Sequence, residues 1–539
     1  MNKSVELEDI QGLVRFAYGH LKQACFLLLR VKEQKQDAAR AWLAQLPVTS
    51  AVDASPAPAR ALQVALTCEG LRALGVGDDI LQGFSVEFVA GMVGDENRSR
   101  RLGDVGDSAP ARWQWGTAQK LPHVLLMLYA QPDGMEAWKR QVLKGAAAGF
   151  QILPELDTTD MDGREPFGFV DGISQPKPDW QRQREVRDQE RGDYTNLSCL
   201  GEFLLGYPNE YGLYTDRPLL DPQGAAAELP RAEDVSDKAD LGRNGSYLVF
   251  RQLHQNVAGF WQYLDRQAGG DATLRTRYAE TMVGRSLDGK PLVESDGLNG
   301  FDYRRDPQGL RCPVGAHIRR ANPRNGDIPP GCPFPSGESE ARGAEPVGVR
   351  AEALPDGDSV TPTPNASTLT LPSPRGRGLV ASLLTPCRCR LLDWLCRTLG
   401  FDAKAREQDL IASTRFHRLL RRGREYGQAV TLDQALAGIQ SETGLHFLCL
   451  NANIARQFEF VQSAWLIGTR FGGLDRESDP LLGDRTPDLN GAATDHYSMP
   501  QSHGASQRLE GLPRFVSVKG GAYFFLPGLR ALRYLVTAT

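Results

Sequence analysis

The chain of 539 residues is too long for one ordinary hydrophobic core, so two domains and an additional segment are expected. A hydrophobic fraction of 41% and a charged fraction of 24% are typical of a soluble globular protein. With 62 Lys and Arg against 66 Asp and Glu, the formal net charge of −4 argues against a nucleic-acid-binding protein.

No targeting or membrane segment is expected. The first residues are acidic, and the apolar run at residues 25–31 is far too short to cross a bilayer. The nine cysteines are scattered and odd in number, which argues against a disulfide framework and favours a reducing compartment. We therefore expect a cytoplasmic protein.

Short apolar runs alternate with amphipathic ones in the first half of the chain. "ACFLLLRV" (residues 24–31) and "HVLLMLYA" (123–130) predict buried strands. "QDAARAWLAQL" (36–46) and "GMEAWKRQVL" (134–143) space their apolar residues at three and four, which predicts surface helices.

A second set of the same kind begins near residue 245. "GSYLVFRQL" (245–253) and "GLHFLCLNAN" (444–453) predict strands, and "NVAGFWQYLDRQA" (256–268) predicts a helix between them. Two similar sets of strands and helices indicate two related α+β domains, although the sequence contains no literal repeat.

One long segment has a different composition. Residues 329–411 are for the most part dense in Pro, Gly and Ser, and such a composition buries too little apolar surface to offset its ordering entropy. We interpret this segment as a mostly flexible insertion, with a short helix expected at residues 391–400.

The stretch "EPFGFVDGISQP" (165–176) places one acid, Asp171, between apolar residues and glycines. Asp171 is either a solvated turn residue or a carboxylate held in a pocket. The preceding "DTTDMDG" does not make a calcium loop, because its register puts Phe169 where a bidentate Glu is required. The stretch also lacks the pattern of a phosphate-binding glycine-rich loop.

A histidine followed by arginines stands in "RCPVGAHIRRANPR" (311–324). His317 follows two small residues and precedes Arg319, Arg320 and Arg324. This is the arrangement expected where an imidazole binds haem iron and guanidinium groups bind the haem carboxylates. It is also the composition of an exposed polar turn, and the segment alone does not decide between the two.

Arginines crowd the stretch "HRLLRRGREYG" (417–427). One interpretation is a basic surface helix that ends at Gly423. The other is that one arginine turns inward as a fixed cation.

Together these segments resemble the dye-decolourising (DyP-type) haem peroxidase family. The resemblance covers nearly the whole chain apart from the insertion, and includes "DIQGLVRFAYGHL", "LTCEGLRALGV", "SAPARWQWG" and "NANIARQFEFVQSAW". Its most specific parts are the G-x-x-D-G element at Asp171 and "GAHIRRANPR".

The resemblance implies two ferredoxin-like α+β domains with antiparallel sheets of the dimeric α+β barrel type. We expect an N-terminal domain at residues 1–235 that carries the loop of Asp171. A C-terminal domain at residues 236–539, interrupted by the insertion at about 329–411, would hold most of the pocket for haem b (iron protoporphyrin IX).

The resemblance also implies roles for single residues. His317 would be the axial ligand of the haem iron, and Asp171 with Arg421 would be the catalytic pair on the distal side. The remaining pocket residues that it implies are Arg320 and Arg324 at the propionates and Leu445 and Phe447 in the apolar distal wall.

Two further assignments follow from the resemblance. The family often carries an acidic residue facing the proximal histidine, and here that place resembles Asn453. An amide oxygen can accept from the imidazole N–H but adds no full negative charge. Tyr426 and Trp465 are candidates for relaying electrons, with packing as core aromatics as the alternative.

The implied function is a haem-dependent peroxidase that reduces hydrogen peroxide through a ferryl intermediate and oxidises organic substrates such as dyes and phenols. The alternative is a haem-handling protein for haem binding, transport or iron release with weak peroxidase activity. We expect peroxide and a small organic reductant as partners, and neither nucleic acid nor a membrane; a homo-oligomer is left open. Because a free aspartate titrates near pH ~4 and a free histidine near ~6.5, an aspartate base predicts an acidic optimum for dye oxidation.

Overall fold

The computed structural model describes residues 4–183, 197–324 and 414–537. The insertion expected at about 329–411 lies outside the described residues, as does the short helix expected at 391–400.

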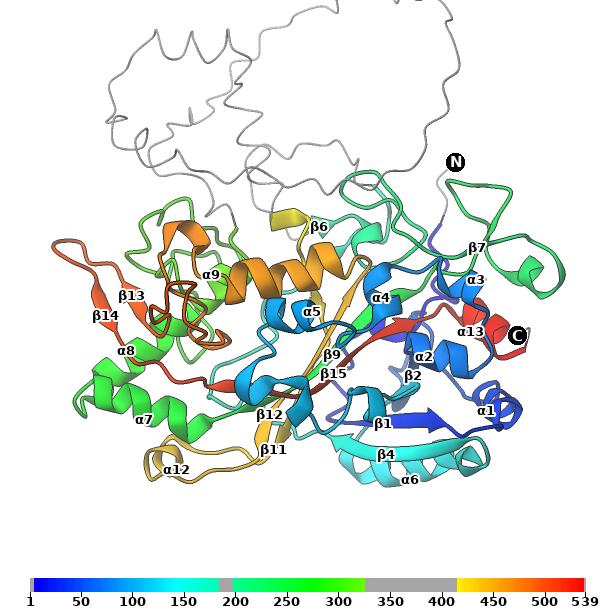
Figure 1. Ribbon diagram of the computed structural model, residues 1–539, viewed down its shortest axis with the longest axis horizontal. Coiled ribbons are helices and arrows are strands. Elements are labelled where there is room, and N and C mark those ends of the chain that lie inside the picture. Colours follow the sequence, from blue (N-terminus) through cyan, green and yellow to red (C-terminus); the bar gives the residue numbers. More distant parts are fainter. Residues whose placement is uncertain (1–3, 184–196, 325–413, 538–539) are drawn as a thin grey trace, which may run out of the picture. The chain divides into compact units, whose positions relative to one another are not determined.

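Nine strands of the described chain form one antiparallel sheet (Figure 1). Their order is β10-β12-β9-β15-β2-β3-β1-β4, and β11 also pairs with β12. The strands are β1 (Gln23–Val31), β2 (Arg60–Leu66), β3 (Val124–Ala130), β4 (Phe150–Asp157), β9 (Ser246–Gln255), β10 (Leu420–Arg421), β11 (Arg424–Gly427), β12 (Thr443–Asn451) and β15 (Val516–Leu526).

Each half of the sheet has the strand order of a ferredoxin-like unit. The first half runs β1-α1-β2-β3-α6-β4 along the chain and β4-β1-β3-β2 in space, with α1 at Gln36–Leu43 and α6 at Pro132–Leu143. The second half repeats this order with β9, β10 and β11, β12 and β15, and α7 (Val257–Gln267) follows its first strand. The two halves join where Phe525 pairs with Leu66. The α+β class is confirmed, whereas the domain boundary near residue 235 stays a prediction.

The strands and helices expected in the first half and around residues 245–268 and 444–453 are present, with ends shifted by a few residues. The surface-helix interpretation of residues 417–427 is wrong, because this stretch forms β10 and β11. Arg422 between them is buried and donates to the carbonyls of Leu13 and Val14. A Cβ on Gly423 would lie 2.7 Å from the carbonyl oxygen of His446, so the chain needs a glycine at this close approach.

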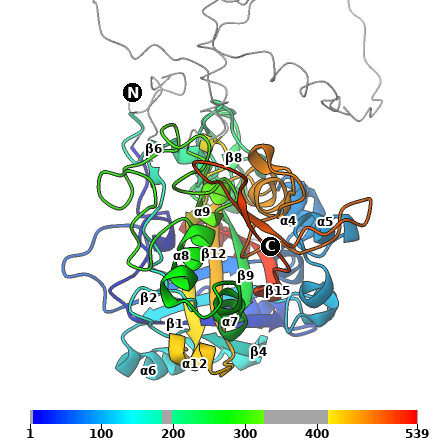
Figure 2. The same cartoon turned by 90° about the vertical axis from the view of Figure 1, so that its left-hand side faces the viewer.

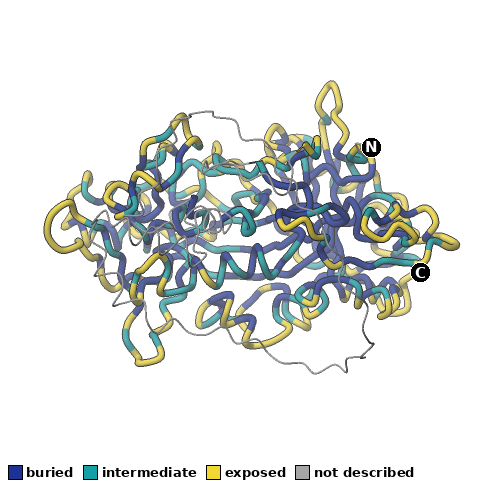
Figure 3. The backbone as a smooth tube through the Cα atoms, turned by 90° about the horizontal axis from the view of Figure 1, so that it is seen from above, coloured by how far each residue is buried: buried dark blue, intermediate teal, exposed yellow. Residues whose placement is uncertain are grey.

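Both faces of the sheet are buried, which explains why its strands are continuous apolar runs. In β1, Cys25, Leu27 and Leu29 belong to one core and Phe26 and Leu28 to the other. Figure 3 shows the buried strands inside and the exposed segments at the surrounding loops.

Further helices and short strands surround the sheet, and α7 and α8 lie side by side at one end of it (Figure 2). These helices are α2 (Cys68–Ala73), α3 (Asp78–Leu81), α4 (Val86–Ala90), α5 (Glu96–Arg101), α8 (Ala272–Val283), α9 (His317–Ala321), α12 (Leu432–Leu436) and α13 (Leu529–Thr537). Two π-helical segments, Ala455–Glu459 and Val461–Ile467, follow β12. The short strands are β5 (Lys177–Pro178), β6 (Leu197–Ser198), β7 (Leu219–Leu220), β8 (Ala239–Asp240), β13 (Tyr497–Met499) and β14 (Gln507–Leu509).

Within the described ranges, none of the helices has the length and apolar content that crossing a membrane requires.

Candidate active site

A cavity of about 600 Å³ opens beside strands β9, β12 and β15. Its walls combine apolar side chains of the sheet with those of the two π-helical segments, while the loop at residues 163–176 and the start of α9 supply polar groups. Its apolar lining includes Leu253, Leu445, Phe447, Phe458, Val461, Trp465, Val516 and Val518. Leu445 and Phe447, which the resemblance assigns to the apolar distal wall, both line this cavity. The size and mixed lining are those of a small-molecule or cofactor site.

His317 is the first residue of α9 and lines the cavity. Its Nδ1 lies 3.0 Å from Oδ2 of Asp479, a fully buried carboxylate whose other oxygen accepts the backbone N–H groups of Leu481 and Leu482. The backbone just before His317 passes close to the Glu477 side chain. A Cβ on Gly315 would lie 2.2 Å from Oε1 of Glu477, so with that side chain in its present place this position has room only for a glycine.

The Asp479 carboxylate decides how the imidazole is protonated. Burial lowers the pKa of His317, but the adjacent Asp479 raises it by more, so the net pKa is above the ordinary value. A neutral ring would keep its proton on Nδ1, facing the carboxylate. Among the described residues no group hydrogen-bonds to Nε2, which is therefore free to bind a ligand atom.

Asp171 lies in a tight loop in the same cavity wall. Its N–H donates to the carbonyl of Gly163 at 3.0 Å, and its Oδ1 accepts the N–H of Gly172 at 2.6 Å. Gly168 and Gly172 have positive φ angles of 103° and 75°, a conformation that favours glycine. Asp171 is thus both a turn residue and a cavity residue, with 36% of its side chain exposed.

Arg421 in β10 is fixed to this loop at three points. Its Nη1 lies 3.4 Å from Oδ1 of Asp171, and its Nη2 donates to the carbonyl of Ser174 at 3.1 Å. Its backbone N–H donates to the side-chain oxygen of Gln175 at 3.0 Å. The fold thereby brings together two residues that are 250 positions apart.

The cavity therefore contains two different acid–base arrangements. One is an imidazole with a free ring nitrogen, backed by a carboxylate, which is the arrangement of a metal-binding histidine. The other is a carboxylate paired with a guanidinium, which can move a proton and stabilise a developing negative charge.

No family model matches the sequence. The chain is 26% identical over 509 residues to the dye-decolorizing peroxidase msp1 of Mycetinis scorodonius, an alignment that covers 89% of this chain and 77% of the relative. It is 25% identical over 503 residues to the multifunctional dye peroxidase DyP2 of Amycolatopsis, covering 88% and 82%.

These relatives support the resemblance of the chain to the dye-decolorizing peroxidase family. The fold agrees with solved structures of this family. The DyP-type peroxidase of Anabaena has a TM-score of 0.66 at 21% identity, covering 98% of this chain and 94% of that one. The DyP-type peroxidase of Auricularia auricula-judae also has a TM-score of 0.66 at 21% identity, covering 99% and 100%.

The cavity fits a haem with two carboxylate tails. Arg324 and Arg285 both line it and both lie over the ring of Phe301, at 3.8 and 5.4 Å. Burial and the nearby Arg324 lower the pKa of Arg285 to about 10. Negative charge beside these two guanidinium groups would relieve their repulsion, so they suit carboxylates.

Arg320 departs from expectation, because it does not line the cavity. Its guanidinium is fully buried and donates to three backbone carbonyls, those of Trp465 at 2.7 Å, Glu477 at 3.2 Å and Gly468. A buried guanidinium requires partners for its donors, and these carbonyls supply them. The expectation that Arg320 faces the propionates is corrected by this geometry.

Asn453 is not the partner of the proximal histidine. Its side-chain oxygen accepts the N–H of Arg456 at 2.8 Å, at the start of the first π-helical segment. The acceptor beside His317 is Asp479, which carries the full charge that an asparagine would lack. The expectation for Asn453 is therefore corrected.

Two site residues could not have been found in the sequence. Asp479 stands 162 positions from His317, and Arg285 stands alone in "MVGRSLDG". Arg285 belongs to no motif, and Asp479 stands among several charged residues of which the sequence singles out none, so only the fold reveals them.

The two candidate relay aromatics have different places. Trp465 lines the cavity, whereas Tyr426 is buried and stacks on His446 with ring centres 4.5 Å apart. An electron-relay role for either residue stays a prediction.

Proposed function

We propose that the chain is a haem b peroxidase that reduces hydrogen peroxide to water and oxidises small organic reductants such as phenols and dyes. The observation that carries this proposal is that the Asp171–Arg421 pair and the His317–Asp479 pair share one cavity. A protein that only carried a cofactor would not need the first pair.

His317 would hold the iron through Nε2, and Arg324 with Arg285 would hold the propionates. Leu445 and Phe447 would form the apolar wall next to the macrocycle. When bound, the haem would supply the redox-active iron on which peroxide is reduced.

Asp171 would take a proton from one oxygen of the peroxide and return it to the other oxygen as that oxygen leaves. A positioned group of this kind typically contributes ~10²–10⁴-fold in rate. The Arg421 guanidinium would stabilise the negative charge that develops on the leaving oxygen. The apolar side chains of the wall exclude bulk water, which strengthens both interactions.

Replacing Asp171 by Asn tests the proposal. The protein with haem supplied should show a Soret band, and stopped-flow mixing with peroxide should change its spectrum rapidly. The Asp171→Asn variant should bind haem as the wild type does but react with peroxide ~10²–10⁴-fold more slowly.

Asp162→Asn is the matched control, because Asp162 is an exposed acid in the same part of the chain and does not line the cavity. This variant should react at the wild-type rate. Haem binding without a rapid reaction of the wild type would favour the haem-handling alternative and overturn the proposal.

We also propose a reducing cytoplasmic location. Four cysteines of the described residues, Cys25, Cys68, Cys312 and Cys449, are buried free thiols. The homo-oligomeric state stays an open prediction.

A further inference from the structure

A second acid, Glu165, lies in the cavity wall six positions before Asp171. Its carboxylate accepts three hydrogen bonds: from the N–H of Phe167 at 3.0 Å, the N–H of Phe169 at 2.9 Å and the side-chain amide of Gln255 at 2.7 Å. The first two donors are backbone groups of the loop that carries Asp171.

The backbone of Glu165 closes the same loop. Its N–H donates to the carbonyl of Phe169 at 2.9 Å, and its carbonyl accepts the N–H of Gly168 at 2.8 Å. Trp261 of α7 donates to the carbonyl of Phe167 at 3.2 Å, which anchors the loop from outside. The position of Asp171, two residues beyond Phe169, therefore depends on the Glu165 carboxylate.

Gln255 at the end of β9 offers this carboxylate a second bonding arrangement. Gln255 is buried, and within the described chain its side-chain oxygen Oε1 has no hydrogen-bond partner. Turning the amide by 180° would exchange its NH₂ group and its oxygen. A protonated Glu165 could then donate its O–H to Oε1, so that both protonation states of Glu165 find a partner.

Charged groups around the loop set the cost of a negative charge on Glu165. Asp171 is the like charge that acts on it, and the other carboxylates in the cavity wall are Asp160 and Glu425. Arg164, Arg285 and Arg421 are cations on this loop or the elements that pack against it. Burial raises the pKa of Glu165 to about 7 despite its hydrogen bonds, and Asp171 raises it further.

We propose that Glu165 is a positioning residue for Asp171, whose carboxyl group fixes the catalytic loop and works in its neutral form by reversing the hydrogen bond to Gln255. This inference rests on the proposed peroxidase function. An ionised Glu165 would add a second negative charge beside Asp171, where negative charge also develops on the peroxide. The rate of reaction with peroxide should therefore fall as the pH rises through about 7.

The test compares wild type, Glu165→Gln and Glu165→Ala over this pH range. In the wild type the rate constant with peroxide should fall about tenfold, a moderate effect for a second like charge in a desolvated site. Glu165→Gln stays neutral and should remain at the high rate across the range. Glu165→Ala removes the anchor and should be slow at every pH.

Glu425→Gln is the matched control, because Glu425 lines the same cavity and burial raises its pKa to about 6, yet its side chain makes no hydrogen bond to the loop among the described residues. It should keep the fall near pH 7. A Glu165→Gln variant that keeps this fall, or a Glu425→Gln variant that loses it, would overturn the inference.

Infrared spectroscopy of the haem-free protein gives a readout independent of activity. Burial also raises the pKa of Glu202 to about 7, so the readout is the difference between each protein and Glu165→Gln, in which the Glu202 band cancels. For the wild type and Glu425→Gln this difference should contain a protonated carboxylic acid band that disappears as the pH rises through about 7. Absence of that difference band for the wild type contradicts the inference. A wild type that gives the difference band but does not react with peroxide would instead overturn the proposed function.

Discussion

At the His317 imidazole, a carboxylate from a distant part of the chain sets the direction of the ring proton. Asp479 is fully buried, and its second oxygen is already occupied by two backbone N–H groups. The remaining oxygen can only accept from Nδ1, which leaves Nε2 as the nitrogen that faces the cavity.

Asp479→Asn tests this arrangement. If the amide oxygen keeps the two backbone bonds, the NH₂ group points at Nδ1 and favours the tautomer with its proton on Nε2. We expect haem affinity or the peroxide rate to fall by ~10–100-fold, as is typical when the partner of a metal-binding histidine is changed. Haem titration of the apoprotein and stopped-flow mixing measure the two quantities.

Asp475→Asn serves as the control, because Asp475 lies in the same loop with 65% of its side chain exposed. It should leave both quantities unchanged. Equal affinity and rate in Asp479→Asn and wild type would show that the Asp479 charge does not act through His317.

Strand β12 forms one wall of the cavity. Its close pairing with β9 leaves no space for a side chain at position 444. Gly444 pairs with His254, and a Cβ on Gly444 would lie 1.8 Å from the carbonyl oxygen of Leu253. Leu253 and Leu445 next to this contact both line the cavity. The glycine therefore allows two cavity strands to pair closely.

Gly444→Ala should push β9 and β12 apart. We expect a loss of roughly 1–3 kcal/mol in the free energy of unfolding, the usual cost of an added group in a packed site. Urea denaturation measures it. Gly134→Ala in α6 is the control, since a Cβ there meets nothing within 4 Å and alanine favours a helix by up to ~1 kcal/mol. Similar urea midpoints for Gly444→Ala and wild type would contradict the steric argument.

The two π-helical segments are the elements that sequence patterns predict least well. They bring Phe458, Val461 and Trp465 to the cavity wall. A π-helix is rare, and its residues per turn differ from the 3.6 of an α-helix. A search for apolar residues at the α-helical period therefore does not detect it.

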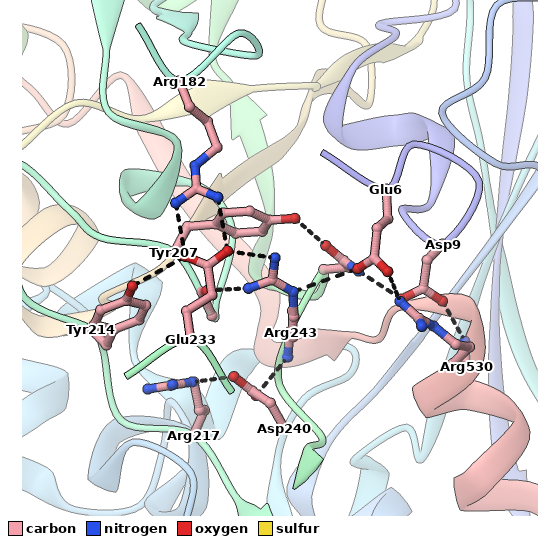
Figure 4. Close-up of polar contacts among 12 residues, drawn as sticks. Glu6, Asp9, Arg182, Tyr207, Tyr214, Arg217, Glu233, Asp240, Arg243 and Arg530 are labelled. Carbon is pink, nitrogen blue, oxygen red and sulfur yellow. Dashed lines mark hydrogen bonds and ion pairs between the residues drawn. The ribbon is translucent and has the colours of Figure 1, made fainter. Parts of the chain in front are cut away.

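At the scale of the whole molecule, ion pairs connect both ends of the described chain to its middle (Figure 4). Arg530 in α13 pairs with Glu6 at 2.7 Å and with Asp9 at 3.2 Å. Arg243 pairs with Glu6 at 3.5 Å and with Glu233 at 2.8 Å.

Glu233 is the most heavily bonded carboxylate of this network. It accepts two bonds from Arg182 and one each from Arg243 and Tyr214, and its side chain is 7% exposed. Burial alone would raise its pKa, but the two arginines lower the pKa by more, so its net value is about 2.

Glu233→Gln should cost stability in a way that depends on pH. The folded-state pKa of about 2 lies below the ordinary value of 4.5, so the ionised group contributes its full stability above pH 4.5 and loses it as the pH falls toward 2. Near pH 7 we expect a loss of roughly 3–5 kcal/mol, because the two arginines lose their charged partner. Urea denaturation at several pH values should show the difference from wild type narrowing in acid.

Glu96→Gln is the control for this prediction, since Glu96 is 81% exposed and its helix pair with Arg100 is worth at most ~0.5 kcal/mol. A Glu233→Gln variant whose deficit stays constant down to pH 2 would show that packing, and not charge, causes the loss.

Apolar spacing was enough to predict the α+β class and most of the first strands and helices, because it is a local property of the chain. The dense local motifs around His317, Asp171 and Arg421 indicated these three residues.

The folded structure was needed to identify Asp479 and Arg285 at the site and to show that Glu165 anchors the loop of Asp171. It also showed that the side chains of Arg320 and Asn453 bond to other partners than the resemblance implied. These assignments depend on partners that the sheet and loops bring together from distant positions in the chain. A buried charged group or amide turns toward the group with which it can form a hydrogen bond, and the sequence does not show which group that is.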